Sequence, residues 1–362
     1  MARQQAVTGR PQGKDYGYGN ARIRGMRSRL LAPNFYEQLI QTQDLARMIA
    51  VLSDTEYGPD LEERLLHGRT TTQVDEALRD NIVRTYRKVL GFLDGQAAYL
   101  ATTLLSRWDV FNVKTIIRGR HLGMHADEID SNVMPAGQFS SGELSVLSRS
   151  PDVRAVVDTL ATWGVEYAGA LSQAVVEYQR DGDIAALELA LDRYYAMWAM
   201  QRLAKRNANY RLAAKIVSIQ IDTTNLMTAI RLQKADMEGV DPLRFFLPGG
   251  LDVDERLFAE LTSMSDIDEL LDGLKATPYG RPLEEEVIHF IEVGSVSVFE
   301  RALEDYLMRK ALRADRGDPL GVGLIIGYLW AKHNEVTNLR IIVKGTTIGM
   351  PEDRMRRELI LV

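Results

Sequence analysis

The sequence predicts an all-α protein built from three tandem helical repeats of about 113 residues each. The first observation is a motif, acid-x-x-Asn-apolar-x-x-apolar-apolar-base, that occurs three times. Its acids are Asp109, Asp222 and Glu335, whose positions rise by the same step from each copy to the next. The second observation is that the apolar residues of each copy recur at i, i+3 and i+4, as they do along one face of a helix. The third is that no run of alternating β-branched residues with hairpin turns predicts a strand.

A repeat of this length sets the division of the chain, because each copy is expected to form one structural unit. We expect a disordered polar tail over residues 1–15 and helical units over residues 16–130, 131–240 and 241–362. Shorter segments recur at one or two periods and support this division: 55–58 with 277–280, 78–80 with 191–193, and 135–137 with 248–250.

Helical patterns fill the chain before the first copy of the motif. Residues 16–31 read as a helix that carries arginines on more than one face, and Pro33 separates it from an amphipathic stretch over 35–52. A long helical stretch is then expected over 75–105. The arginine-rich helix could contact nucleic acid or lipid, but a solvated or partner-facing helix is favoured because nothing nearby is basic.

The polar members of the motif are predicted to be partly buried. At 100° per residue, Asp109 falls on the same stripe as Val113 and Ile116, with Asn112 at its edge. A buried polar group needs a partner, either a ligand or a neighbouring helix end. Three copies at one spacing favour the structural role. The predicted anchor residues are Asp109, Asn112, Asp222, Asn225, Glu335 and Asn338.

The bases that close each copy, Arg118, Arg231 and Lys344, fall on the opposite side of their helices. We expect them to be solvated or to face a partner. The same prediction applies to Arg22 and Arg24 on the arginine-rich first helix.

Composition excludes several classes of function. The 44 basic and 50 acidic residues give a net charge of −6, which argues against general nucleic-acid binding. Cysteine is absent, so disulfides and thiolate metal sites are excluded. No apolar run is long enough to span a membrane, and the N-terminus lacks the apolar stretch of a secretory signal. These features predict a cytosolic protein.

No motif with catalytic chemistry stands out. Gly321, Gly323 and Gly327 form a loose dinucleotide fingerprint, but a helical pattern precedes them and their equivalents include alanines. His121 and His125 are four positions apart, yet Gly123 interrupts the helix between them and neither recurs. We therefore predict no catalytic residue, no metal and no cofactor.

The chain resembles one family in four segments. These are Tyr-x-Asn-Ala-Arg-Ile-Arg over 18–24, Tyr57-Gly58, and the first and third copies of the motif, over 108–119 and 335–345. They are similar to the C subunit of the V/A-type ATPase or ATP synthase, which is called d in the eukaryotic vacuolar proton pump. The second copy departs, with Ile221 at the tryptophan position and Leu232 in place of glycine.

The resemblance implies a funnel of three pseudo-symmetric helical domains on the cytoplasmic face of the membrane proteolipid ring. It implies a peripheral, non-catalytic rotor subunit that contacts the central-stalk subunits D and F, receives the foot of D, and couples the stalk to the ring. It leaves open a contact with the membrane stator subunit. ATP chemistry and the choice between protons and sodium would belong to other subunits.

Two alternatives remain at this point. One is an all-helical repeat adaptor unrelated to any ATPase, although a period of about 113 residues is much longer than that of common solenoids. The other is an all-α enzyme that uses Asp109 and Asn112, or their copies, as an acid–ligand pair.

Overall fold

The computed structural model describes residues 16–233, 240–316 and 319–361. The predicted tail over 1–15 lies outside the described residues. All regular secondary structure in the described ranges is helical, which confirms the all-α class. Contacts between Cα atoms divide the chain into two compact units, residues 1–102 with 311–362, and residues 103–310.

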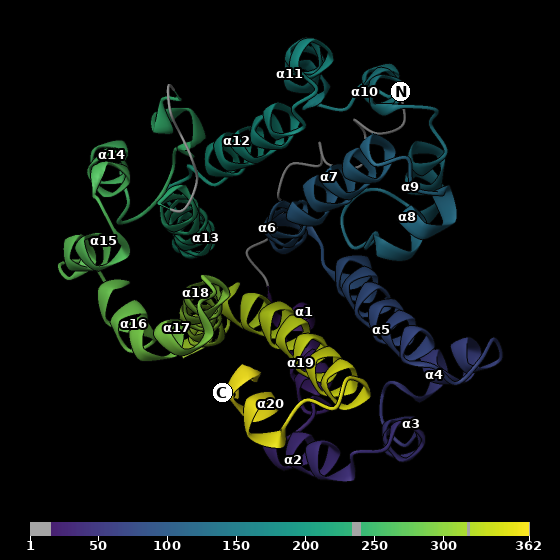
Figure 1. Cartoon of the computed structure of the whole chain (residues 1–362). Coiled ribbons are helices and arrows are strands. Elements are labelled where there is room, and N and C mark those ends of the chain that lie inside the picture. Colours follow the sequence, from purple (N-terminus) through teal and green to yellow (C-terminus); the bar gives the residue numbers. More distant parts are fainter. Residues whose placement is uncertain (1–15, 234–239, 317–318, 362) are drawn as a thin grey trace. The chain divides into compact units, whose positions relative to one another are not determined.

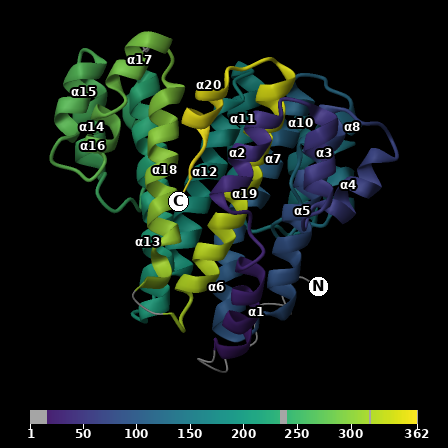
Figure 2. The same cartoon turned by 90° about the horizontal axis from the view of Figure 1, so that it is seen from below.

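Unit 1 combines the two ends of the chain around one long helix, α19 (Gly323–Thr347). This helix packs against α1, α2, α3, α5, the 3-10 turn η2 and α20, and it runs beside α1 and α5 (Figures 1 and 2). The other elements of unit 1 are α1 (Gly17–Arg27), α2 (Pro33–Thr42), α3 (Leu45–Ser53), α4 (Gly58–Leu65), α5 (Thr71–Phe92), η2 (Ala314–Arg316) and α20 (Glu352–Glu358).

Unit 2 contains two hydrophobic cores, one around α7 and one around the C-terminal half of α13. Its elements are α7 (Arg107–His121), α8 (Ala126–Asn132), α9 (Ser141–Ser148), α10 (Val153–Thr162), α11 (Ala168–Asp181), α12 (Ala185–Arg202), α13 (Ala208–Leu232), η1 (Pro242–Phe245), α14 (Glu255–Ser263), α15 (Ile267–Leu274), α16 (Gly280–Glu284) and α17 (Val287–Val293). Helices α6 (Gly95–Leu105) and α18 (Ser297–Leu312) cross the boundaries between the units.

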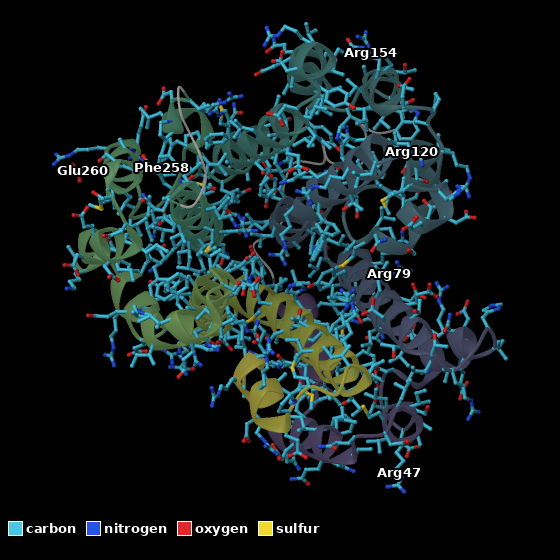
Figure 3. All side chains as sticks on the ribbon, viewed as in Figure 1. Arg47, Arg79, Arg120, Arg154, Phe258 and Glu260 are labelled. Carbon is cyan, nitrogen blue, oxygen red and sulfur yellow. The ribbon has the colours of Figure 1, made fainter. Side chains whose placement is uncertain are left out.

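The short helices of unit 2 are amphipathic, and α14 illustrates how they join a core. Phe258 is fully buried in the second core, whereas Glu260, two residues later, lies on the exposed side of the same helix (Figure 3). Residues two apart lie about 200° apart around a helix, so one faces the core and the other faces solvent.

Side-chain caps mark where many of these helices begin. Asp44, Ser140, Asp152, Asp254 and Asp266 each accept a hydrogen bond from the backbone N–H three residues later. Each cap satisfies one of the N–H groups that the first turn leaves without a partner, and contributes about 1 kcal/mol.

The long helical stretch expected over 75–105 is helical but is interrupted at residues 93–94. Leu93 is extended, and Gly95 has a φ of 49°, a left-handed conformation that glycine adopts without strain, so α5 and α6 are separate helices. In contrast, the helix before the second motif and the motif itself form one 25-residue helix, α13, and the same holds for α19.

Close packing accounts for the glycine at position 323, the first residue of α19. A Cβ atom at Gly323 would lie 2.3 Å from the carbonyl oxygen of Ala314, so only glycine allows this approach, whereas Gly327 has ordinary space. No strand precedes this segment in the described part of the chain, so Gly323 serves packing rather than a dinucleotide-binding turn.

Candidate functional site

All six predicted anchor residues are buried, as the helical periodicity indicated. They lie on α7, α13 and α19. Their exposed fractions are 4% for Asp109, 3% for Glu335 and 0% for Asn112, Asp222, Asn225 and Asn338. Buried carboxylates and amides require full hydrogen bonding, so their partners decide their role.

Each anchor asparagine pairs with both backbone groups of one residue, 22 positions further along the chain. The side chain of Asn112 donates to the carbonyl oxygen of Met134 at 2.7 Å and accepts from its N–H at 2.6 Å. Asn225 makes the same two bonds with Leu247, both at 2.9 Å. Asn338 makes them with Ile360, at 3.0 and 3.2 Å.

The first two anchor acids bind the backbone that follows this clamp. Asp109 accepts from the N–H groups of Gln138 at 2.9 Å and Phe139 at 3.1 Å. The carboxylate of Asp222 accepts from three successive N–H groups, those of Leu251, Asp252 and Val253, at 2.8–3.1 Å. Asp109 therefore holds the segment that leads into α9, and Asp222 holds the segment that leads into α14.

A glycine lies against each of these carboxylates. A Cβ atom at Gly137 would be 2.3 Å from Oδ1 of Asp109, and one at Gly250 would be 2.1 Å from Oδ1 of Asp222. Sequence reasoning placed both glycines in loops at equivalent positions of two repeats but assigned them no contact. The recurrence of these glycines at the repeat period was the sequence signal that could have indicated a shared contact.

We expect Gly250→Ala to lower the free energy of unfolding by about 1–3 kcal/mol, because the added methyl group must displace the Asp222 carboxylate. Urea unfolding measures this change. The matched control is Gly142→Ala in α9, where a Cβ atom meets nothing within 4 Å, and which should be neutral or stabilising. Equal effects at the two glycines would contradict the prediction.

The third anchor acid takes its partners from the N-terminal part of the chain. Glu335 accepts from the N–H of Leu31 at 2.5 Å and from the hydroxyl of Tyr57 at 2.7 Å. Leu31 directly precedes Ala32, the N-cap residue of α2. Phe139 and Val253 hold the same position before α9 and α14, so all three acids bind an equivalent N–H group.

Two tyrosines complete the second and third anchors, and sequence reasoning missed their role. Tyr279 donates its hydroxyl hydrogen to Asp222 at 2.8 Å, as Tyr57 does to Glu335. Burial raises the pKa of Tyr279, of Tyr57 and of the Asp222 carboxyl above their ordinary values. The recurring Thr-x-Tyr-Gly segment, at 55–58 and 277–280, was the signal.

A buried lysine distinguishes the third anchor. The ammonium of Lys332 lies 2.7 Å from Glu335 and 2.9 Å from the Tyr57 hydroxyl, and it sits 4.1 Å from the centroid of the Tyr57 ring. Burial lowers its pKa, against the effect of Glu335. The equivalent residues in the other copies are Ser106 and Ile219, so no repeat signal identifies this lysine.

The bases of the three motifs are half-exposed, and each forms an ion pair. Arg118 pairs with Glu188, Arg231 with Glu300 at 2.8 Å, and Lys344 with Asp75 at 3.4 Å. The three carboxylates themselves recur at the repeat period, to within one position. Arg22 and Arg24 are exposed, and no described carboxylate pairs with either.

A family model described as ATP synthase (C/AC39) subunit matches residues 19–358, nearly the whole described fold. The chain belongs to this family. It is 30% identical over 351 residues to the C subunit of the V-type ATP synthase of Deinococcus radiodurans, covering 95% of this chain and 91% of the relative.

Two A-type relatives give the same result. The identity is 27% over 345 residues with the C subunit of the A-type ATP synthase of Methanocaldococcus jannaschii, covering 95% of this chain and 86% of the relative. It is 28% over 355 residues with the same A-type protein of Haloferax volcanii, covering 97% and 99%. These matches overturn the adaptor alternative.

The C/AC39 family is one of structural, non-catalytic subunits of V/A-type ATP synthases. The anchor geometry fits this role, because the oxygens of Asp109 and Asp222 already accept hydrogen bonds from backbone groups. In the described residues, no cluster of three or more histidines or carboxylates could hold a metal, and His121 contacts the Tyr178 hydroxyl at 3.0 Å. The catalytic interpretation of Asp109 and Asn112 is not retained.

No helix in the described ranges combines the length and the apolar character that crossing a membrane requires.

Proposed function

We propose that this C/AC39 protein couples the central stalk of a V/A-type ATP synthase to the membrane proteolipid ring. Its partners would be the central-stalk subunits D and F and the ring, and it would lie at the periphery of the membrane on the cytoplasmic face. The observation that carries the proposal is the family match over residues 19–358. Rotary transport or synthesis would then pass through a subunit with no catalytic residue of its own.

We also propose that the fold consists of three pseudo-symmetric repeats, over about 16–130, 131–240 and 241–362, arranged as a funnel. The recurring contacts support the repeats. Each anchor asparagine clamps the residue 22 positions later, and each anchor acid binds the N–H that precedes the cap of another helix. A funnel with an axial opening would suit a subunit that lies between a stalk and a round ring.

A stiff fold of packed helices supports the proposed coupling role. Torque is transmitted only by a body that deforms little, and close-packed helices deform little. In this chain, hydrogen-bonded carboxylates and amides join each long helix to the segment that follows the motif, or to the N-terminal segment. These buried bonds oppose sliding of the helices relative to the connecting loops.

The experiment is native mass spectrometry of the tagged protein after gentle extraction from membranes. We expect one copy to be recovered with ring and stalk subunits, and the same spectra test a contact with the stator subunit. Recovery of the chain as a free monomer, from membranes in which the remaining subunits stay assembled, would contradict the coupling role. A tagged catalytic subunit from the same membranes is the control for intact complexes.

A further inference from the structure

The five basic residues predicted to face partners fall into two groups. Arg118, Arg231 and Lys344 are already paired with carboxylates of their own unit. Arg22 and Arg24, on α1, have no carboxylate within ion-pair distance among the described residues. In a chain with a net charge of −6, two exposed arginines on one helix, neither of them paired with a carboxylate of the described residues, indicate an anionic partner.

Helix α1 presents these arginines on its exposed side. Its buried side contains Gly19, Asn20 and Ile23, and its first turn has no acidic residue. Arg22 and Arg24 lie at the two edges of the exposed side, because residues two apart lie about 200° apart around a helix. The exposed residues of this side, called here the α1 face, are Gly17, Tyr18, Ala21, Arg22, Arg24, Gly25 and Ser28.

Both guanidinium groups are held in place by neutral partners. Arg22 lies 4.6 Å from the centroid of the Phe92 ring and donates to the Tyr18 hydroxyl at 2.8 Å. Arg24 donates to the carbonyl oxygen of Pro319 at 2.8 Å. A guanidinium has five N–H donors in a planar arrangement that matches phosphate oxygens, so each arginine retains donors for a ligand.

Large apolar side chains flank the two arginines. Tyr18 is 65% exposed beside Arg22, and Leu320, which follows the Pro319 carbonyl that holds Arg24, is also 65% exposed. Small residues, Ala21 and Gly25, occupy the middle of the face, and a Cβ atom at Gly25 would meet nothing within 4 Å. Arginines with exposed aromatic and aliphatic neighbours are typical of surfaces that rest at a lipid headgroup layer.

We propose that the α1 face binds anionic phospholipid headgroups at a membrane surface. Arg22 and Arg24 contact the phosphate oxygens, while Tyr18 and Leu320 rest against the interfacial region. The site is independent of the anchor residues. It deepens the proposed function, on which its biological setting rests, by assigning one surface of the subunit to lipid.

The test is flotation of the full chain with phosphatidylcholine vesicles that contain or lack phosphatidylglycerol. We expect binding only to the anionic vesicles, weakened by salt. The double variant Arg22→Gln/Arg24→Gln should bind the anionic vesicles about 30-fold less tightly. This factor corresponds to the loss of about 1 kcal/mol of attraction to the anionic surface for each of the two basic residues. The matched control, Arg118→Gln/Arg231→Gln, removes the same charge from paired positions and should bind like the wild type.

Equal losses in the two double variants, or binding that does not depend on phosphatidylglycerol, would overturn the proposal. Thermal unfolding of each variant separates loss of binding from loss of folding. A further measurement is the binding of the wild type and the variants to purified proteolipid ring in lipid-free detergent. If Arg22→Gln/Arg24→Gln loses binding to the ring while vesicle binding is unchanged, the partner is an acidic protein loop and the lipid assignment is wrong.

The two proposals fail in different ways. Vesicle binding by a chain that native mass spectrometry never finds with a ring would leave the lipid site standing and refute the coupling role. Recovery of intact complexes together with an absence of vesicle binding would support the coupling role and refute the lipid site.

Discussion

Replacing Asp222 by alanine is expected to lower the free energy of unfolding of the chain by about 3–5 kcal/mol. The substitution removes the acceptor for the N–H groups of Leu251, Asp252 and Val253 and for the Tyr279 hydroxyl. Each buried donor left without a partner costs about 1–3 kcal/mol, and water that enters the space recovers part of the total. Asp222 is completely buried, so solvent does not replace the carboxylate without rearrangement.

Urea unfolding followed by circular dichroism measures the loss, and hydrogen exchange at residues 251–253 locates it. Thr224→Ala, two residues away on the exposed side of α13, is the control and should change stability by less than about 0.5 kcal/mol. Unchanged protection of the 251–253 amides in Asp222→Ala would show that these hydrogen bonds do not hold the loop.

Replacing Glu335 by glutamine is expected to destabilise the chain by about 3–5 kcal/mol, because it leaves the Lys332 ammonium buried without its counter-charge. The side chains of the pair are only 5% and 4% exposed, so water cannot compensate. Glutamine keeps the size of the side chain and one carbonyl acceptor for Leu31 or Tyr57, which isolates the effect of charge.

The double variant Lys332→Met/Glu335→Gln tests this reason. With both charges removed and the volume kept, we expect most of the lost stability to return, since buried ion pairs replaced by neutral groups are often close to neutral in effect. Urea unfolding of the wild type, both single variants and the double variant forms the complete cycle. A double variant as unstable as Glu335→Gln alone would mean that the carboxylate acts through its hydrogen bonds and not through the lysine.

The sequence predictions that succeeded depended on the helical periodicity of apolar residues. The positions of Asp109 and Asn112 relative to the apolar stripe determine which side of α7 they occupy, so their burial follows from 100° per residue. The same reasoning placed Arg118 and Arg231 on the exposed side, where they are 55% and 56% exposed. The interruption of the helical stretch over 75–105 was not predicted, because the backbone breaks at Leu93 and Gly95 while the side-chain periodicity continues on both sides.

The partners of the anchors could not be read from the sequence. Every residue except proline carries a backbone N–H, so nothing in the residue types marks Met134 or Leu247 as the group that an asparagine clamps. Glu335 binds Leu31, 304 positions earlier in the chain, and the buried Lys332 has no counterpart in the other repeats.

The sequence by itself determined the helical class, the repeat period, the inward side of each motif helix and the resemblance that the C/AC39 match confirms. These properties depend on residue type and on spacing along one helix. The tertiary structure decided which backbone groups satisfy the buried acids, which bases pair with carboxylates of the chain, and which two arginines on α1 meet no carboxylate among the residues described. Those outcomes depend on which segments the packed helices bring within hydrogen-bonding distance, and distance in the fold is not encoded in the spacing of the residues concerned.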